Sequence, residues 1–346
     1  MAKVAINGFG RIGRTFFRMA FDHPDFDIVA VNDLGDINNF VYLLKYDTAY
    51  GQAQFDVQAG DGVLTVNGKS IAFLSEKDPK ALPWGHMGVD IVVESTGFFA
   101  SYAGSKAHLD AGAKRVVISG PVSDDPMVAG VTGATVLMGV NEATLATCSV
   151  TSNASCTTNA VSPLVAILKE AIGIEKAILN TTHAYTASQS LVDGPSKKDF
   201  RGGRAAAQNI VPSSTGAAKA TTLAHTELKG KFDGISIRVP VPVGSIVDVT
   251  FIASKNTTVE EVNEALTKAA ATEKWKELFA ITNEQLVSSD IIGTRFAAIA
   301  DLEMTRVVDG NLVKVLAWYD NETSYTSTLL AHVAMVARFF NAKTGG

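Results

Sequence analysis

The feature that most restricts the possible folds of this chain is the hexapeptide Gly8-Phe9-Gly10-Arg11-Ile12-Gly13. It follows a short apolar segment, Lys3–Asn7. A helical pattern of apolar residues comes next, and a second apolar segment, Ile28–Asn32, ends at Asp33, twenty residues after Gly13. Strand, glycine turn, helix, strand and acidic residue at this spacing are typical of a dinucleotide-binding fold. The sequence therefore predicts a parallel sheet flanked by helices, with a dinucleotide held at the glycine turn.

Each glycine of this motif has a separate physical role in a dinucleotide-binding turn. Gly8 permits the tight turn, Gly10 lets a pyrophosphate approach the helix N-terminus, and Gly13 allows the helix to pack closely on the strand. Asp33 can accept hydrogen bonds from ribose hydroxyls and would repel a 2′-phosphate, which favours NAD over NADP. An ordinary strand-to-helix turn is the alternative, and the position of Asp33 argues against it.

Polar residues also follow the next predicted strands. Val89–Val93 ends before Glu94-Ser95-Thr96-Gly97, and Val116–Ile118 ends before Ser119-Gly120. Ligands bind beyond the carboxyl ends of parallel strands, so we expect contact with the cofactor from Thr96, Gly97 and Ser119. Ordinary turn chemistry at strand ends is the alternative.

Cys156 lies among hydroxyl residues just before a helical apolar pattern that runs from Val161 to Leu168. Ser155 is a candidate N-cap, which would place Cys156 in the first turn. The positive end of the helix favours an anion, so we expect the thiol to ionise more easily than a free one and to act as a nucleophile. A small buried hydrophobe is the alternative. Pro163 conflicts with the helix because it removes one hydrogen bond.

His183 follows a predicted strand, Ala177–Asn180, and could take the thiol proton as a general base. Alone it could equally be a hydrogen-bonded core histidine, since it is far from Cys156 in sequence. Residues 188–209 read as a long loop, in which Arg201 and Arg204 could bind an anion or simply be solvated.

The second half otherwise reads as strands joined by turns, with one helix at Val259–Ala270. We expect a largely antiparallel sheet, with Asp309-Gly310 as a hairpin turn. Arg238 lies within an apolar strand and should meet a carboxylate or a bound phosphate. Further predicted elements are strands at Thr135–Val140, Ile235–Val239, Ile246–Ala253, Phe296–Ile299 and Val313–Trp318, a hairpin turn at Asn67-Gly68, a helix that starts at Ser213–Gly216, and a C-terminal helix capped by Asn321.

Composition limits the class of protein. The chain has 346 residues, of which 47% are hydrophobic and 19% charged, enough for two domains with packed cores. The net charge of -5 argues against a nucleic acid as the main partner, and no apolar run is long enough to span a bilayer. The two cysteines and six histidines show no disulfide or metal spacing, so we expect no metal and a reducing, cytoplasmic location.

Taken in order, these segments resemble the phosphorylating glyceraldehyde-3-phosphate dehydrogenases over nearly the whole chain. The resemblance rests on Ile6–Arg14, Val31–Asp33, Glu94–Gly97, Ser155–Asn159, His183–Thr186, Arg201–Arg204, Ser213–Lys219 and Trp318–Glu322. It implies a Rossmann-type NAD-binding domain, residues 1–154, completed by a C-terminal helix, 322–346. It also implies a catalytic domain, residues 155–321, with a largely antiparallel sheet, and a cytoplasmic homotetramer.

The resemblance also implies a reaction. Cys156 would attack glyceraldehyde 3-phosphate with His183 as base, and inorganic phosphate would release 1,3-bisphosphoglycerate from a thioester. The implied NAD-binding residues are Gly8, Gly10, Arg11, Ile12, Gly13, Asp33, Lys77, Thr96, Gly97, Ser119 and Asn321. The implied residues for the two phosphates are Ser155, Thr157, Thr186, Arg201, Thr215, Gly216 and Arg238, with Arg204 nearby.

Three alternatives stay open at this point. An erythrose-4-phosphate dehydrogenase would share the fold and the thiol chemistry, and sequence separates the two poorly. A non-catalytic NAD-binding or nucleic-acid-binding protein on the same scaffold is disfavoured by the acidic balance and by the intact Cys156 and His183. A biosynthetic semialdehyde dehydrogenase fits the serine- and threonine-rich anion motifs less well.

Overall fold

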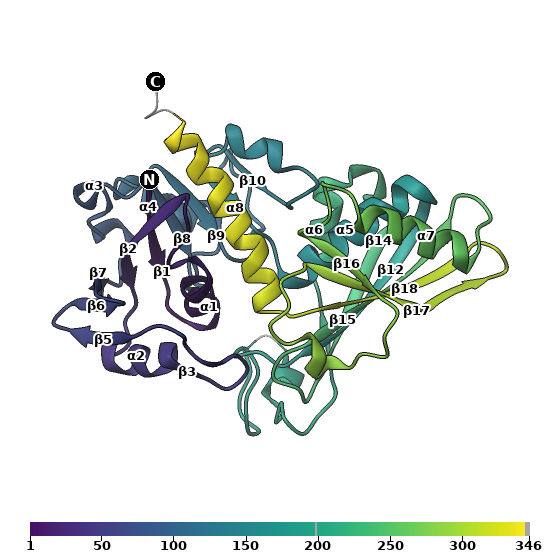
Figure 1. Cartoon of the computed structure of the whole chain (residues 1–346), viewed down its shortest axis with the longest axis horizontal. Coiled ribbons are helices and arrows are strands. Elements are labelled where there is room, and N and C mark those ends of the chain that lie inside the picture. The colour runs from purple at the N-terminus through teal and green to yellow at the C-terminus, as the bar shows by residue number, and fades with distance from the viewer. Residues whose placement is uncertain (198, 343–346) are drawn as a thin grey trace. The chain divides into compact units, whose positions relative to one another are not determined.

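The computed structural model describes residues 1–197 and 199–342 and separates into two compact units (Figure 1). The first unit holds residues 1–154 and the described residues from 326 onward, and the second holds residues 155–325. Lys198 in the predicted long loop and residues 343–346 of the predicted C-terminal helix lie outside the described residues.

The first unit is built on a nine-stranded sheet in the order β10-β11-β9-β8-β1-β2-β7-β6-β5. The strands from β10 to β7 are parallel, and β6 and β5 are antiparallel to their neighbours. Their bounds are β1 Ala2–Asn7, β2 Phe26–Asn32, β5 Val57–Gly60, β6 Val63–Val66, β7 Lys69–Leu74, β8 Ile91–Glu94, β9 Arg115–Ile118, β10 Gly133–Thr135 and β11 Val150–Ser152. A separate two-stranded ribbon joins β3 Tyr46–Asp47 to β4 Gly51–Gln52.

Helices cover both faces of this sheet because alternate residues of its central strands are apolar on both sides. Val4 and Ile6 belong to one buried cluster with residues of α1 and α8, whereas Ala5 belongs to another with Trp84 and Tyr102 of α3 and α4. The helices are α1 Arg11–Ala20, α2 Ile37–Lys45, α3 Trp84–Met87, α4 Tyr102–Asp110 and α8 Thr323–Asn341, with short 3₁₀ turns at Pro79–Ala81 and Glu142–Ala146. The predicted Rossmann-type architecture is confirmed.

Strand β1 lies at the point where the strand order reverses. The chain runs from β1 through α1 to β2 on one side, and later returns to place β8 on the other side. In open parallel sheets, ligands bind outside the carboxyl ends of the strands at such a switch point. The fold therefore puts the ends of β1 and β8, Asn7 and Glu94, at the expected binding edge.

The second unit is built on a seven-stranded sheet in the order β13-β14-β12-β15-β18-β17-β16. Four of its six strand pairs are antiparallel, and β12–β14 and β16–β17 are parallel. The strands are β12 Ile174–Ala184, β13 Val211–Ser214, β14 Phe232–Val239, β15 Ser245–Ala253, β16 Phe279–Thr282, β17 Ala298–Val308 and β18 Leu312–Tyr319. The helices are α5 Cys156–Ala171, α6 Ala217–Ala224 and α7 Val259–Ala270, with 3₁₀ turns at Phe200–Gly203, Thr226–Leu228 and Ser288–Ile291. The largely antiparallel sheet is confirmed.

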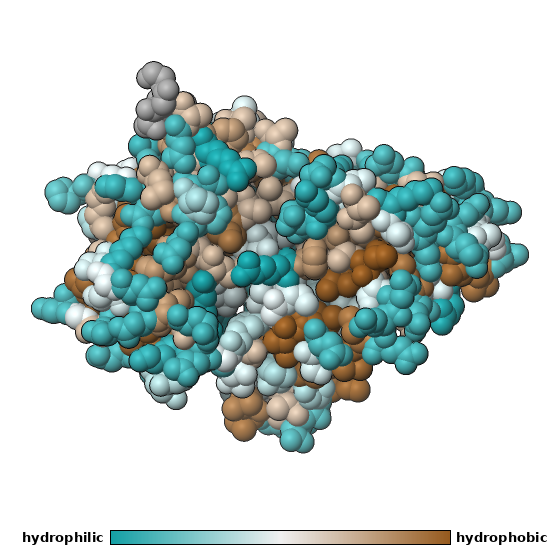
Figure 2. Space-filling view, in the orientation of Figure 1, coloured by the Kyte–Doolittle hydropathy of each residue, from teal (hydrophilic) through white to brown (hydrophobic). Residues whose placement is uncertain are grey.

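One face of this second sheet packs against helices α5, α6 and α7, and the other carries exposed apolar side chains. Along β15, Val247, Val249 and Phe251 are buried, while the alternate residues are half-exposed. The strand registers place Ile178, Ile235 and Leu312 on the half-exposed face. Figure 2 shows apolar surface over the part of this unit that contains β15 and β18.

Two predicted hairpin turns are confirmed, because left-handed residues stand where they are needed. Asn67 and Gly68 have φ of 47° and 81°, and Asp309 and Gly310 have φ of 48° and 75°, as a type I′ turn requires. The predicted helix from Cys156 is also confirmed. It continues through Pro163 to Ala171, so the proline does not end it.

Several predicted boundaries are wrong. The strand at Thr135–Val140 ends at Thr135, because the chain turns at Gly139, whose φ is 79°, and Asn141 bonds to the backbone of Leu137 and Thr135. The strand at Phe296–Ile299 begins only at Ala298.

Two predicted helix starts are also displaced. Ser213 and Ser214 belong to strand β13, where they pair with β14, and helix α6 begins at Ala217. Asn321 does not cap the last helix. The Asp320 side chain accepts from the backbone N–H groups of Glu322 and Thr323 instead.

In the described parts of the chain, no helix is both long and apolar enough to cross a membrane.

Candidate active site

A cavity of about 620 Å³ opens at the carboxyl ends of the first unit's central strands. Its lining combines strand-end amides, glycines, acidic groups and two adjacent phenylalanines. The residues are Asn7, Gly8, Gly10, Asn32, Asp33, Leu34, Glu76, Lys77, Ser95, Thr96, Phe98 and Phe99. Five predicted cofactor residues therefore share one cavity: Gly8, Gly10, Asp33, Lys77 and Thr96.

The glycines of the first turn fit a dinucleotide. Gly8 has φ of 96°, and a Cβ there would lie 2.6 Å from the backbone of Ser95 and Thr96. A Cβ on Gly13 would lie 2.1 Å from the carbonyl oxygen of Gly8, whereas one on Gly10 would meet nothing within 4 Å. Gly8 and Gly13 are thus required by packing, and Gly10 leaves open space. Because Gly10 is also the N-cap of α1 and offers no side-chain cap, that space suits a pyrophosphate.

Asp33 is held by the backbone, with its Oδ2 accepting from Phe9 N at 2.6 Å and its Oδ1 from Gly35 N at 3.1 Å. This fixes the carboxylate at the cavity wall, where it can accept from ribose hydroxyls. The Arg11 side chain is occupied elsewhere, because it forms an ion pair with Asp47 and lies 5.6 Å from the centre of the Tyr50 ring. Any contact of Arg11 with a cofactor is therefore expected from its backbone.

The remaining predicted cofactor residues of this unit have other surroundings. Ile12 packs against the core, and Gly97, with φ of 74°, turns the chain after Thr96. Ser119 donates to the hydroxyl oxygen of Ser95 at 2.9 Å. Ile12, Gly13, Gly97 and Ser119 are absent from the described lining of the cavity.

In the second unit, Cys156 Sγ lies 3.3 Å from His183 Nε2. Cys156 is the first residue of α5, and the side chain of Ser155 caps this helix by accepting from Thr158 N at 3.1 Å. His183 is buried near the end of β12, a strand longer than predicted. The fold thus brings together a thiol and an imidazole that are distant in sequence.

The second imidazole nitrogen of His183 has two close polar neighbours. Nδ1 lies 2.6 Å from the carbonyl oxygen of Ala184 and 2.7 Å from Arg238 Nη1. These two neighbours demand opposite roles of Nδ1, because the carbonyl only accepts and the guanidinium only donates. The tautomer that a general base needs is the one with its proton on Nδ1, directed at Ala184 O, and with Nε2 as an acceptor facing the thiol. Arg238 also donates to Ala184 O at 3.1 Å, so Arg238 lies beside the pair. The carboxylate expected for it is not found among the described residues, and its contact with a bound phosphate stays a prediction.

The expectation of an easily ionised thiol is wrong for this resting pair. Burial raises the pKa of the Cys156 thiol, and Arg238 and the first backbone N–H groups of α5 offset this only in part. Burial and the positive charge of Arg238 lower the pKa of His183 to about 4. Both shifts favour a neutral thiol hydrogen-bonded to a neutral imidazole, which is the form that a general base requires before attack.

Sequence reasoning missed the role of Tyr319, although it lies inside the motif Trp318-Tyr319-Asp320-Asn321. Its hydroxyl lies 2.9 Å from Thr157 Oγ1 and 2.9 Å from Thr181 Oγ1. Its ring also packs edge-on to His183, with the ring centres 5.9 Å apart. Tyr319 therefore ties the first turn of α5 to strand β12, which carries the base.

The predicted phosphate-binding residues have different partners. Thr186 bonds to Ser188, and Thr215 accepts from Ala217 N at the start of α6, next to Gly216, where a Cβ would meet nothing within 4 Å. Both Arg201 and Arg204 form exposed ion pairs with carboxylates of their own loop, Asp199 and Asp193. Both arginines are therefore already paired, whereas Arg238 has no carboxylate partner among the described residues and contacts His183 and Ala184 O.

Asn321 is fixed by its carbonyl end. Its Oδ1 accepts from Gly244 N at 3.1 Å and from Ser245 Oγ at 3.0 Å. The Ser245 hydroxyl also accepts from Ala184 N, the residue after His183. Nδ2 is therefore the end of the amide left to donate to a ligand such as a carboxamide oxygen.

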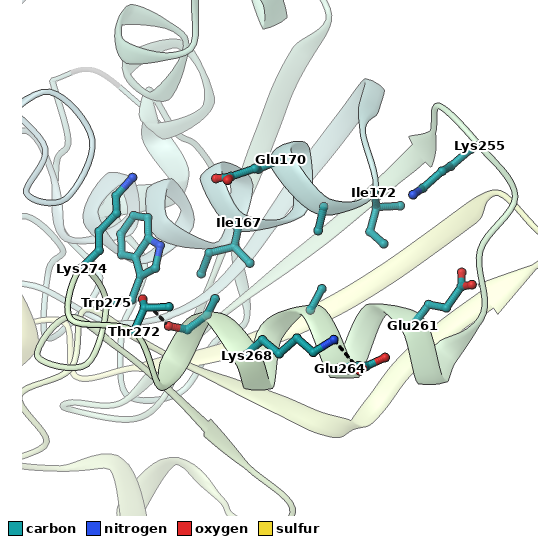
Figure 3. A pocket seen from close by; sticks show the side chains of 13 residues that line it. Ile167, Glu170, Ile172, Lys255, Glu261, Glu264, Lys268, Thr272, Lys274 and Trp275 are labelled. Carbon is teal, nitrogen blue, oxygen red and sulfur yellow. Dashed lines mark hydrogen bonds and ion pairs between the residues drawn. The ribbon is translucent and has the colours of Figure 1, made fainter.

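A further hollow of about 660 Å³ lies between α5 and α7 (Figure 3). Its floor is apolar, and three acidic and three lysine side chains surround it. Lys268 forms an ion pair with Glu264, and Lys274 lies 4.8 Å from the centre of the Trp275 ring. None of the predicted site residues lines this hollow.

A dinucleotide-binding sheet in one unit and a helix-capped thiol with an imidazole base in the other define a class, the nicotinamide-dependent dehydrogenases that use a thiol. Comparison with known families gives the same class. Residues 2–102 match the NAD binding domain of glyceraldehyde 3-phosphate dehydrogenase, and residues 155–321 match its C-terminal domain. The chain belongs to the glyceraldehyde-3-phosphate dehydrogenase family, and NAD is its cofactor.

Similar proteins extend over nearly the full length. Glyceraldehyde-3-phosphate dehydrogenase of Clostridium pasteurianum is 44% identical over 343 residues, which is 98% of this chain and 99% of that protein. The enzyme of Geobacillus stearothermophilus is 47% identical over 337 residues, 97% of this chain and 98% of the relative. Glyceraldehyde-3-phosphate dehydrogenase B of Aspergillus oryzae is 45% identical over the same coverage.

Proposed function

We propose that this protein oxidises glyceraldehyde 3-phosphate to 1,3-bisphosphoglycerate with NAD and inorganic phosphate, through a thioester on Cys156. The observation that carries the proposal is the 3.3 Å contact between Cys156 Sγ and His183 Nε2 at the capped start of α5, in a member of this family. We propose that the two units correspond to an NAD-binding domain, residues 1–154 with helix 322–346, and a catalytic domain, residues 155–321.

The chain's own groups can perform the acid–base steps. As Sγ bonds to the aldehyde carbon, the thiol proton passes to His183 Nε2 and then to the former carbonyl oxygen, giving a hemithioacetal. The backbone N–H of Cys156, in the first turn of α5, can stabilise the developing oxyanion. His183 takes the hydroxyl proton when the thioester forms. Phosphate then attacks the thioester carbon, the carbon–sulfur bond breaks, and His183 returns a proton to the thiolate.

NAD, when bound, supplies the acceptor for the hydride of the hemithioacetal. The N-terminus of α1 at Gly10 would hold its pyrophosphate, Asp33 its ribose hydroxyls, and Asn321 Nδ2 its carboxamide. Lys77 and Thr96 line the same cavity as Asp33.

For the substrate and the attacking phosphate, we propose two groups of anion-binding residues. Arg238 supplies a cation beside His183, and the hydroxyls of Thr157 and Thr186 and the α6 start at Thr215 and Gly216 supply hydrogen bonds. Ser155 contributes mainly as the cap of α5. Arg201, with Arg204 nearby, would bind an anion once its ion pair with Asp199 opens.

The test is NADH formation from NAD and glyceraldehyde 3-phosphate, with and without phosphate, for wild type, Cys156→Ser and Cys148→Ser. We expect phosphate-dependent turnover that Cys156→Ser abolishes and that the buried control Cys148→Ser retains. Turnover without phosphate would contradict the second anion site. Faster turnover with erythrose 4-phosphate would contradict the substrate assignment.

We also propose that the protein is a cytoplasmic homotetramer. The exposed apolar residues Ile178, Ile235 and Leu312 on one face of the second sheet support an interface between copies. The free thiols of Cys148 and Cys156 support a reducing compartment. Light scattering should give four times the chain mass, and Ile235→Lys should lower it. An unchanged assembly would contradict the role of this face.

A further inference from the structure

Buried polar side chains form a continuous ladder below the cofactor cavity of the first unit. Asn32 Nδ2 donates to Asn7 Oδ1 at 2.7 Å, and Asn7 Nδ2 donates to Glu94 Oε2 at 2.6 Å. These three residues end β2, β1 and β8, which are neighbours in the sheet. The side chain of Glu94 is fully buried, and so is that of His108 beside it. The ladder joins the carboxyl ends of the strands where the cofactor is expected.

The direction of the hydrogen bonds around His108 is fixed by Trp84. The indole Nε1 of Trp84 lies 3.0 Å from His108 Nδ1, and an indole nitrogen can only donate. We therefore assign the His108 proton to Nε2, which lies 3.0 Å from Glu94 Oε2 and donates to it. Oε2 thus accepts from both Asn7 and His108.

The other oxygen of Glu94 holds the cavity wall. Oε1 accepts from the backbone N–H of Thr96 at 2.8 Å and from the Thr96 hydroxyl at 2.5 Å. The same hydroxyl oxygen accepts from Phe98 N at 3.1 Å, across the left-handed turn at Gly97. Since its proton goes to Glu94, the Thr96 hydroxyl is not available to donate to a cofactor.

In the wall formed by residues 95–99, packing within the chain does not explain the exposed ring of Phe98. Ser95, Thr96, Phe98 and Phe99 all line the cavity, and the Phe98 side chain is 91% exposed. An aromatic ring exposed at a cavity, on a turn that a buried carboxylate holds through Thr96, can stack on a flat ligand.

We propose that Glu94 is a positioning residue for NAD binding, which acts through Thr96 to hold the wall formed by residues 95–99, and that His108, oriented by Trp84, holds Glu94. This proposal rests on NAD binding by the first unit and not on the identity of the aldehyde. Glu94 has no direct role in the reaction, because its four donors already come from the chain.

The first test is Glu94→Gln, read as the dissociation constant of NAD by calorimetry. Glutamine keeps the size of the side chain, but its NH₂ meets an existing donor in either orientation, Thr96 N on one side or Asn7 and His108 on the other. We expect NAD binding to weaken about tenfold. The matched control is Asp90→Asn, which precedes the opposite end of β8 and accepts from Lys3 N at 2.8 Å, and it should bind NAD like wild type.

The second variant, Glu94→Gln with Trp84→Phe, separates positioning from general stability. Without the indole donor, the His108 proton can move to Nδ1, and Nε2 can then accept from the new amide. This removes one of the two donor–donor contacts of that amide and leaves the one with Asn7 Nδ2, so the relief is partial. We therefore expect the double variant to bind NAD about threefold more tightly than Glu94→Gln, although it unfolds at a lower temperature. If the ladder only stabilised the fold, the double variant would both bind NAD more weakly and unfold at a lower temperature than Glu94→Gln.

Thr96→Val gives a test that leaves the buried ladder in place. It should weaken NAD binding, and Thr96→Ser should restore it, because serine keeps the hydroxyl between Glu94 and Phe98. The proposal is overturned if Glu94→Gln or Thr96→Val binds NAD like wild type, or if the double variant binds more weakly than Glu94→Gln. Wild type that binds NAD but does not oxidise the aldehyde would refute the proposed function alone, whereas wild type that does not bind NAD would refute both.

Discussion

His332 makes the stability of the first unit depend on pH. It lies in α8 with none of its surface exposed, and its Nδ1 lies 3.1 Å from Asn153 Oδ1 and its Nε2 2.8 Å from Thr151 Oγ1. The amide oxygen can only accept, so Nδ1 carries the proton and Nε2 accepts from the threonine hydroxyl. Burial lowers the pKa of His332 from 6.5 to about 3.

The direction and size of the change in unfolding free energy follow from the difference between the pKa of His332 in the unfolded and in the folded state. The native state resists protonation, so its stability is fully present above about pH 6.5 and is lost as the pH falls toward 3. At pH 5 the histidine is almost fully charged in the unfolded state and neutral in the native state. This lowers the free energy of unfolding by about 2 kcal/mol relative to neutral pH. The complete difference is worth about 5 kcal/mol, a large part of a typical unfolding free energy of about 5–15 kcal/mol.

The assay is equilibrium unfolding in urea at pH 7.5 and pH 5, at one protein concentration, for wild type and His332→Gln. Glutamine does not titrate in this range, whereas all carboxylates are common to both proteins and cancel in the difference. We expect wild type to lose about 2 kcal/mol more than His332→Gln between the two pH values. The exposed His86 supplies the control, because His86→Gln should follow wild type. Equal losses in wild type and His332→Gln would refute the reasoning.

Two further predictions concern the site. Tyr319→Phe removes the hydroxyl between Thr157 and Thr181, so the free energy of unfolding in urea should fall by about 2 kcal/mol. The kcat should also fall, because the start of α5 and β12 lose their link. Unchanged stability would mean that water replaces the hydroxyl. Gly13→Ala places a Cβ 2.1 Å from a backbone oxygen and should lower both the unfolding temperature and NAD affinity, whereas Gly10→Ala, which meets nothing, should lower NAD affinity alone. Equal unfolding temperatures for these two variants would contradict the assigned roles of the glycines.

The parts of the fold that could be predicted are those decided by local chemistry. The glycine turn before α1, the Asn67-Gly68 hairpin and the Ser155 cap of α5 each depend on residues within a few positions of one another. The predicted boundaries of strands and helices were wrong where pairing with a segment distant in sequence determines them. Ser213 and Ser214 resemble a helix start, but pairing with β14 makes them a strand, and the local pattern has no information about that partner.

The candidate site divides in the same way. The residue types of Cys156 and His183 could be read from the chain, but their 3.3 Å contact depends on the packing of α5 against β12. The pKa of the thiol was predicted in the wrong direction because the helix start is a local signal, whereas burial belongs to the folded unit. The ladder around Glu94 was missed because its members come from strands and helices that are distant in sequence and meet only in the folded unit.

Asn321 shows why a motif assigns a residue to a site more securely than it assigns the residue's task. Its position near the last helix suggested a cap, and an asparagine there could offer an oxygen or an NH₂ to its surroundings. The structure decides between them, because Gly244 N and Ser245 Oγ both donate to Oδ1 and Asp320 takes over the cap. Only the NH₂ end is then left for a ligand. What a polar side chain can do to a substrate or cofactor is therefore set by which of its atoms the fold has already used.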